Sequence, residues 1–144
     1  MIRRLDHVAI AVRRLEERIP FYRDLLGMPL SAVEEVREEK VRVAILGSGA
    51  GRVELLEASG AGSPVEKFVR ERGEGIHHLC FLVDSLEKAC YRLRREGIRL
   101  VGGIREGSEG SKIAFLHPKD AGGVLIELRE ARREAARPEG AAEP

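Results

Sequence analysis

The chain has 144 residues, enough for one domain, and its 43% of hydrophobic residues can supply a core. A formal net charge of +1, with 4% aromatic residues and no Trp, gives no support for nucleic-acid binding, which usually needs a basic surface. No apolar run is long enough to span a membrane and no apolar signal region opens the chain, so we expect a cytoplasmic protein.

The first half of the chain predicts a strand, a helix and three further strands. Apolar residues at helical spacing define the helix: Leu15, Ile19, Tyr22, Leu25 and Leu26. Gly27 suits the C-terminal cap of this helix, and Pro20 suits its first turn or a kink. The strands are expected at residues 4–12, 28–36, 40–47 and 52–58.

A linker helix and a repeat of the same order follow. Val65–Arg72 predicts the linker helix, with Ser63 as N-cap and Glu66 placed for a capping box. The next helix carries Leu86, Ala89, Cys90 and Leu93 on one face and stops at Gly97. Strands are expected at 76–83, 98–101, 112–117 and 123–129, with a flexible loop at Gly107–Ser111.

These elements predict a single domain over residues 1–130. Module one covers about 4–58, the linker helix about 63–73 and module two about 76–130. The Arg-, Glu- and Ala-rich residues 131–144 are expected to be a disordered tail. Cys80 and Cys90 are expected to be free, buried thiols in a reducing compartment.

Two histidines and two glutamates recur at matched places in the two halves. His7 and His78 each open an apolar strand, and Glu54 and Glu127 each interrupt a later apolar strand at nearly the same separation. Because a lone buried carboxylate is costly, each glutamate needs a partner or a metal. Two imidazoles and two carboxylates suit a divalent first-row metal with open coordination positions, so we predict one metal site built by pseudo-symmetry.

The alternation of strand side chains predicts which face carries this site. In the first strand the small side chains share the face of His7, and the bulky ones share the opposite face, which should pack on helices. The strand that begins at His78 behaves in the same way. By parity His77 points to the opposite face, with a packing or supporting role. His117, at a strand end, is expected at the surface or in a supporting role.

Four stretches resemble the vicinal oxygen chelate (glyoxalase–bleomycin resistance–extradiol dioxygenase) superfamily and, within it, the methylmalonyl-CoA epimerase family. They are Asp6–Val12, Val53–Glu57, Gly73–Leu79, and Phe115–Asp120 running into Gly122–Leu128. The Ser63–Phe68 segment also resembles the linker helix of the epimerases. The resemblance covers about residues 4–130 and implies an α+β fold. In that fold two βαβββ modules in tandem form a cupped mixed β-sheet around a metal site, with helices on the outer face.

The same resemblance implies reversible interconversion of (R)- and (S)-methylmalonyl-CoA by a homodimer. It implies one divalent metal ion, with Co²⁺ favoured and Mn²⁺, Ni²⁺, Zn²⁺ or Mg²⁺ as alternatives. The metal ligands map onto His7, His78 and Glu127, and the remaining ligand position, often Gln in the family, falls on Glu54. By resemblance Glu127 is also a catalytic base, whereas Glu54 is expected only to bind the metal.

The second acid–base group is unassigned at this point. Epimerisation removes a proton from one face of a carbon and delivers one to the other, so two groups are needed. In some relatives a glutamate occupies the place of Val43, where this chain has no carboxylate. Lys112, Lys119 and the Gly107–Ser111 loop are candidate contacts for the phosphates of coenzyme A.

Two alternatives stay open. A glyoxalase I-type lactoylglutathione lyase uses the same four ligand types, and a metal-free small-molecule-binding module shares the fold. The stretch from Phe115 to Leu128 favours the epimerase over the lyase, and four converging ligands argue against the metal-free module. An extradiol dioxygenase needs Fe(II) and three protein ligands, so a fourth ligand at Glu54 argues against that activity.

Overall fold

The computed structural model describes residues 1–49 and 51–131. The first half contains β1 (Ile2–Ala11), α1 (Leu15–Pro20), β2 (Leu30–Val36), β3 (Val41–Leu46) and β4 (Arg52–Ala58). The second half follows α2 (Pro64–Arg72) and contains β5 (Gly75–Val83), α3 (Leu86–Arg95), β6 (Leu100–Glu106), β7 (Lys112–Leu116) and β8 (Ile126–Glu130). The predicted order of elements is therefore confirmed in both halves.

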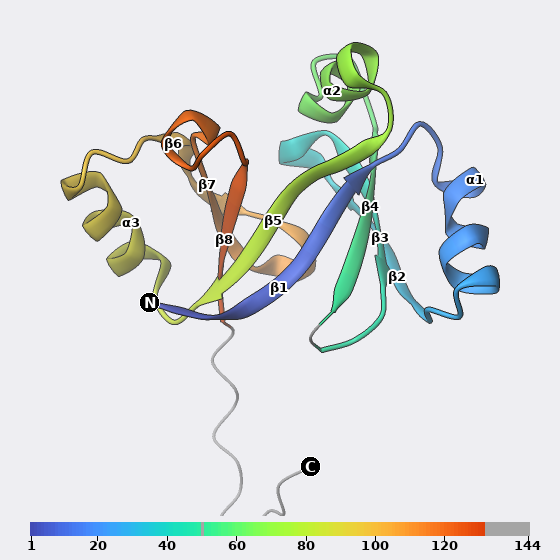
Figure 1. The fold of residues 1–144 in the computed structure, drawn as a ribbon, viewed down its shortest axis with the longest axis horizontal. Coiled ribbons are helices and arrows are strands. Elements are labelled where there is room, and N and C mark those ends of the chain that lie inside the picture. Colours follow the sequence, from blue (N-terminus) through green and yellow to red (C-terminus); the bar gives the residue numbers. More distant parts are fainter. Residues whose placement is uncertain (50, 132–144) are drawn as a thin grey trace, which may run out of the picture.

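The strands form one curved mixed sheet in the order β2-β3-β4-β1-β5-β8-β7-β6 (Figure 1). Within each half the first strand runs parallel to the last, as β1 with β4 and β5 with β8. The halves join where β1 and β5 pair in antiparallel fashion. The strand order is thus the same on both sides of this central pair, which confirms the α+β fold with two modules in tandem.

The two faces of the sheet are covered differently. Leu15 of α1 and Leu86 of α3 are fully buried in clusters on the outer face. On the inner face, Ala9 and Ala11 of β1 cluster with Val65 of α2. The predicted alternation of small and bulky side chains along β1 is therefore confirmed. Helices α1 and α3 lie on the outer face as predicted, whereas α2 packs on the inner-face cluster at one end of the sheet.

The first helix departs from its predicted course after Pro20. Phe21–Leu25 form a π-helix, closed by a bond from the Leu26 N–H to the Phe21 carbonyl of 3.1 Å. The wider turn changes the helical spacing, so Leu25 and Leu26 are exposed instead of packed on the sheet. Gly27 does end the segment, with a φ of 75°.

Smaller differences concern the ends of elements. Strand β6 is longer than predicted, and β8 begins at Ile126 because residues 118–123 form turns. The Ser63 hydroxyl caps α2 by accepting from the Val65 N–H, but Glu66 forms an ion pair with Arg70 instead of closing a capping box.

Two further predictions concern the thiols and the tail. Cys80 and Cys90 are free and buried, as predicted. None of the described helices is both long and apolar enough to cross a membrane. From residue 132 onward, the predicted tail lies outside the described residues.

Candidate metal and active site

The neighbouring strands β4, β1, β5 and β8 carry the predicted ligands on the inner face of the sheet. Glu54 in β4 pairs with the residue two positions after His7 in β1. Glu127 in β8 pairs with the residue two positions after His78 in β5. The two His–Glu pairs therefore share one register, and all four side chains are buried. The structure thus confirms that the four residues share one face of the sheet.

Three of these residues converge closely. Glu127 Oε1 lies 3.2 Å from His78 Nε2 and 3.3 Å from His7 Nε2. One ligand atom from each of the three lies within 4.8 Å of the others. Although His7 Nε2 is buried and near Glu127, it makes no hydrogen bond. A buried nitrogen without a partner, beside a carboxylate and a second imidazole, fits a divalent metal ion.

Glu54 lies beside His7 on the opposite edge of the imidazole ring. Its Oε2 atom is 3.0 Å from His7 Nδ1 and 3.5 Å from Arg52 Nη2. The structure therefore brings three of the four predicted ligands together and places Glu54 at their side. A role for Glu54 as the fourth ligand stays a prediction.

Each histidine of the site is oriented by its neighbour in the chain. Asp6 Oδ2 lies 2.8 Å from His7 Nδ1, and His77 Nδ1 lies 2.8 Å from His78 Nδ1. A contact at Nδ1 fixes the ring orientation and leaves Nε2 free to bind a metal. Both histidines therefore present Nε2 toward Glu127.

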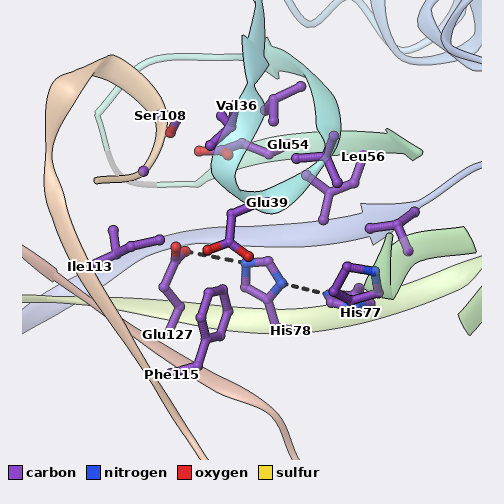
Figure 2. Close-up of a pocket in the computed structure, with 15 residues that line it drawn as sticks. Val36, Glu39, Glu54, Leu56, His77, His78, Ser108, Ile113, Phe115 and Glu127 are labelled. Carbon is purple, nitrogen blue, oxygen red and sulfur yellow. Dashed lines mark hydrogen bonds and ion pairs between the residues drawn. The ribbon is translucent and has the colours of Figure 1, made fainter. Parts of the chain in front are cut away.

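The orientation predicted for His77 from strand parity is wrong. Along β1, successive residues pair with His78 and then with Ile76, so His77 is the extra residue of a β-bulge. The bulge interrupts the two-residue period, and the His77 ring turns toward the same cavity as His78 (Figure 2). Its contacts with His78 and with the Phe68 ring confirm a packing role, whereas a supporting role in a metal site stays a prediction.

A chain of ion pairs surrounds His7 and Glu54, the site residues of the first half. Arg129 contacts Asp6 at 3.2 Å and Glu109 at 2.6 Å. Arg52 contacts Glu109 at 3.3 Å and Glu54 at 3.5 Å. Sequence reasoning missed this network because its members come from distant strands and loops. The available signal was a charged residue, Asp6 or Arg129, inside a strand.

The pKa values of the site follow these contacts. Burial opposes ionisation of Glu127, but its close contacts with the imidazoles of His7 and His78 lower its pKa well below the ordinary range, so it stays ionised. The pKa of Asp6 is also lowered despite burial, by His7 and Arg129. Burial and the neighbouring His78 lower the pKa of His77 to about 4, so this imidazole is neutral at pH 7. The group that orients the histidine is thus charged in the first half, where it is Asp6, and neutral in the second half, where it is His77.

An apolar cavity borders His78 and Glu127. Its volume is about 50 Å³, room for a small group of atoms. Phe115 packs edge-on against His78, with ring centroids 5.3 Å apart. Most of the lining is apolar: Val43, Leu56, Val65, Ile113 and Phe115. Such a lining keeps bulk water from the carboxylate.

A wider groove of about 430 Å³ continues from the cavity between α2 and residues 123–125. Lys67 and Arg72 line this groove, whereas Lys112 and Lys119 line neither space. The predicted loop contributes Gly107 and Ser108 to the cavity wall.

The rest of the predicted loop and His117 have other contacts. Glu109, predicted to lie in a flexible loop, is tied by ion pairs to both arginines of the network. His117 has a local structural role, since its Nδ1 accepts a hydrogen bond from the Lys119 N–H in the turn after β7.

Comparison with known proteins places the chain among enzymes of one superfamily. Residues 4–128 match the model of the Glyoxalase/Bleomycin resistance protein/Dioxygenase superfamily. The mitochondrial methylmalonyl-CoA epimerase of Mus musculus is 42% identical over 130 residues, which cover 89% of this chain and 73% of that protein.

Two solved structures are similar throughout the fold. The crystal structure of methylmalonyl-CoA epimerase from Mycobacterium tuberculosis is 42% identical, with a TM-score of 0.87 over 92% of this chain and 90% of that one. A structure of methylmalonyl-CoA epimerase in complex with methylmalonyl-CoA and NH4+ is 36% identical, with a TM-score of 0.87 over 91% of this chain and 96% of that one.

Proposed function

The chain belongs to the glyoxalase/bleomycin resistance protein/dioxygenase superfamily, and we propose that it is an isomerase that interconverts (R)- and (S)-methylmalonyl-CoA. The observation that carries this proposal is the convergence of His7, His78 and Glu127 beside an apolar cavity. The epimerases that resemble the chain over most of its length support the same reaction.

The chemistry of the substrate explains why such a site is suitable. The reacting carbon lies between a carboxylate and a thioester, so loss of its proton leaves an enolate with charge on the thioester oxygen. We propose that His7, His78 and Glu127, with Glu54 beside them, hold a divalent ion. When bound, this ion supplies positive charge that stabilises the developing enolate oxygen. The resemblance favours Co²⁺, with Mn²⁺, Ni²⁺, Zn²⁺ and Mg²⁺ as the alternatives.

The protein residues then have distinct roles. Glu127 removes the proton, because its carboxylate borders the cavity beside the two imidazoles. Asp6 and His77 keep the two imidazoles in position, and the apolar lining keeps water from the reacting carbon.

The rest of the substrate needs an extended binding surface. We propose that part of the coenzyme A chain lies in the groove beside α2, whose wall carries the cations Lys67 and Arg72 as well as the carboxylate of Glu71. Contacts of Lys112 and Lys119 with the phosphates, a homodimeric state and a cytoplasmic location stay predictions.

The experiment that tests the function starts from a single enantiomer of methylmalonyl-CoA in D2O. We expect the wild type to form the other enantiomer with deuterium at the reacting carbon, and Glu127→Ala to form none of it. Retained inversion in Glu127→Ala would remove Glu127 from the mechanism. Turnover of the glutathione–methylglyoxal adduct in place of methylmalonyl-CoA would favour the lyase and overturn the proposal.

A further inference from the structure

Inversion at the reacting carbon needs a second proton-transfer group opposite Glu127. Of the described residues that line the cavity, the carboxylates are Glu39, Glu54 and Glu127. Glu54 is engaged by His7 and Arg52 at the side of the ligand cluster. Glu39 is the remaining carboxylate, and it has no role in the metal site described above.

Glu39 reaches the cavity because of the turn between β2 and β3. Arg37–Glu39 form a single 3₁₀ turn, and Lys40 follows in the left-handed region with a φ of 52°. This reversal places Glu39 on the same cavity wall as Val41 and Val43. Figure 2 shows the Glu39 side chain reaching from this turn toward His78 and Glu127. A carboxylate from module one thus faces the cavity that Glu127 borders from module two.

Arg105 of β6 holds Glu39 in this position. Its Nε atom donates to Glu39 Oε1, and both side chains are partly buried. Arg105 is itself fixed, because Nη1 donates to the carbonyls of Val101 and Gly103 at 3.0 and 3.1 Å. Its guanidinium also lies 5.1 Å from the centre of the Phe115 ring. A partly buried carboxylate with one fixed cationic partner is held in place at the cavity, with an oxygen left for the substrate.

We propose that Glu39 is the second acid–base residue of the reaction and that Arg105 positions it. The inference rests on the proposed epimerase function. Glu39 would take the place of the carboxylate that is missing at Val43. In one direction, Glu127 accepts the proton as the C–H bond breaks, and the electron pair moves onto the thioester oxygen. A protonated Glu39 then donates its proton to the opposite face of the carbon. The enolate returns to a thioester, Glu39 is left ionised and Glu127 is left protonated; the reverse direction exchanges the two roles.

The test compares Glu39→Gln with Glu38→Gln, a matched change at an exposed neighbour in the same turn. Each variant and the wild type are incubated in D2O with each enantiomer of methylmalonyl-CoA separately. We expect Glu39→Gln to lower the rate of inversion by about 100-fold or more. It should still exchange deuterium into one enantiomer without inversion, because Glu127 can remove a proton and return a deuteron to the same face. Glu38→Gln should behave like the wild type.

Further variants separate positioning from structural effects. Arg105→Met should lower kcat with little change in KM, and Arg105→Lys should recover part of the loss. Glu39→Asp, which keeps the carboxylate, should retain part of the inversion even where Glu39→Gln unfolds. Circular dichroism and Co²⁺ binding report whether each variant keeps its fold and its metal site.

Three results would overturn the inference. The first is inversion by Glu39→Gln at the wild-type rate. The second is that Glu54→Gln, and not Glu39→Gln, exchanges deuterium without inversion. The third is loss of both inversion and exchange in a folded Glu39→Gln that still binds Co²⁺. A wild-type protein that inverts neither enantiomer would instead contradict the proposed function itself.

Discussion

The two halves of the sheet carry the same His–Glu pair in the same register but surround it differently. His7 and Glu54 lie within a network of ion pairs that extends to Arg52 and Arg129. His78 and Glu127 border the apolar cavity, and their neighbour His77 is neutral. We propose that duplication of the module sets where the ligands lie, and that the local charges decide which half anchors the site and which half meets the substrate.

The largest effect is expected at the glutamate that borders the cavity. Glu127→Gln keeps the size and an oxygen atom but cannot accept the proton, so the rate of inversion should fall by about 100- to 10,000-fold. The measurement is the conversion of one enantiomer of methylmalonyl-CoA to the other. A loss smaller than about tenfold would show that another group is the base.

A loss of stability is expected when Asp6, in the half of the sheet that contains His7 and Glu54, loses an ion-pair partner. Arg129→Met removes the buried guanidinium nearest to Asp6, which should lower the free energy of unfolding by about 3–5 kcal/mol. Urea denaturation measures this change. Arg3→Met, which removes an exposed ion pair with Asp84, is the control and should change stability much less. Equal losses in the two variants would argue against an anchoring role for the network.

The two supporting groups should differ in their effect on metal binding. Asp6→Asn removes a buried charge from His7 and should weaken Co²⁺ binding by about 10- to 100-fold. His77→Gln replaces a neutral group beside His78 and should weaken binding less. Calorimetric titration of Co²⁺ into each variant measures both affinities. A larger loss in His77→Gln would reverse the assignment of anchor and reactive half.

The smallest effect is expected at Glu54, the glutamate of the first half. Glu54→Gln keeps an oxygen donor and matches the residue often found at this family position. The rate of inversion should therefore fall less than about tenfold, which corresponds to about 1.4 kcal/mol in the barrier. The same inversion assay measures it beside Glu127→Gln. Equal losses in the two variants would remove the functional difference between the halves.

The alternation of strand side chains made the ligand face predictable. His7, Glu54, His78 and Glu127 all lie on the predicted face because the two-residue period holds along their strands. The same period gave the wrong face for His77, since a bulge interrupts it there. Local insertions of this kind leave no clear mark in a single sequence.

Contacts between distant segments were not predictable from the sequence. Glu39 lies in the charged stretch between the strands predicted at 28–36 and 40–47, and its place at the cavity depends on Arg105 in the other module. Glu109 lies in a glycine-rich loop, and its role depends on two arginines from other strands. Such contacts arise only when the curved sheet brings the two modules together.

The most direct test of a single site built from both halves is Co²⁺ binding by the wild type, His7→Ala and His78→Ala. The visible absorption spectrum of bound Co²⁺ gives both stoichiometry and affinity. We expect one ion per chain in the wild type and a loss of that ion in each variant, because we propose that the two imidazoles bind the same metal. One ion that stays bound with unchanged affinity after the loss of either histidine would contradict a shared site.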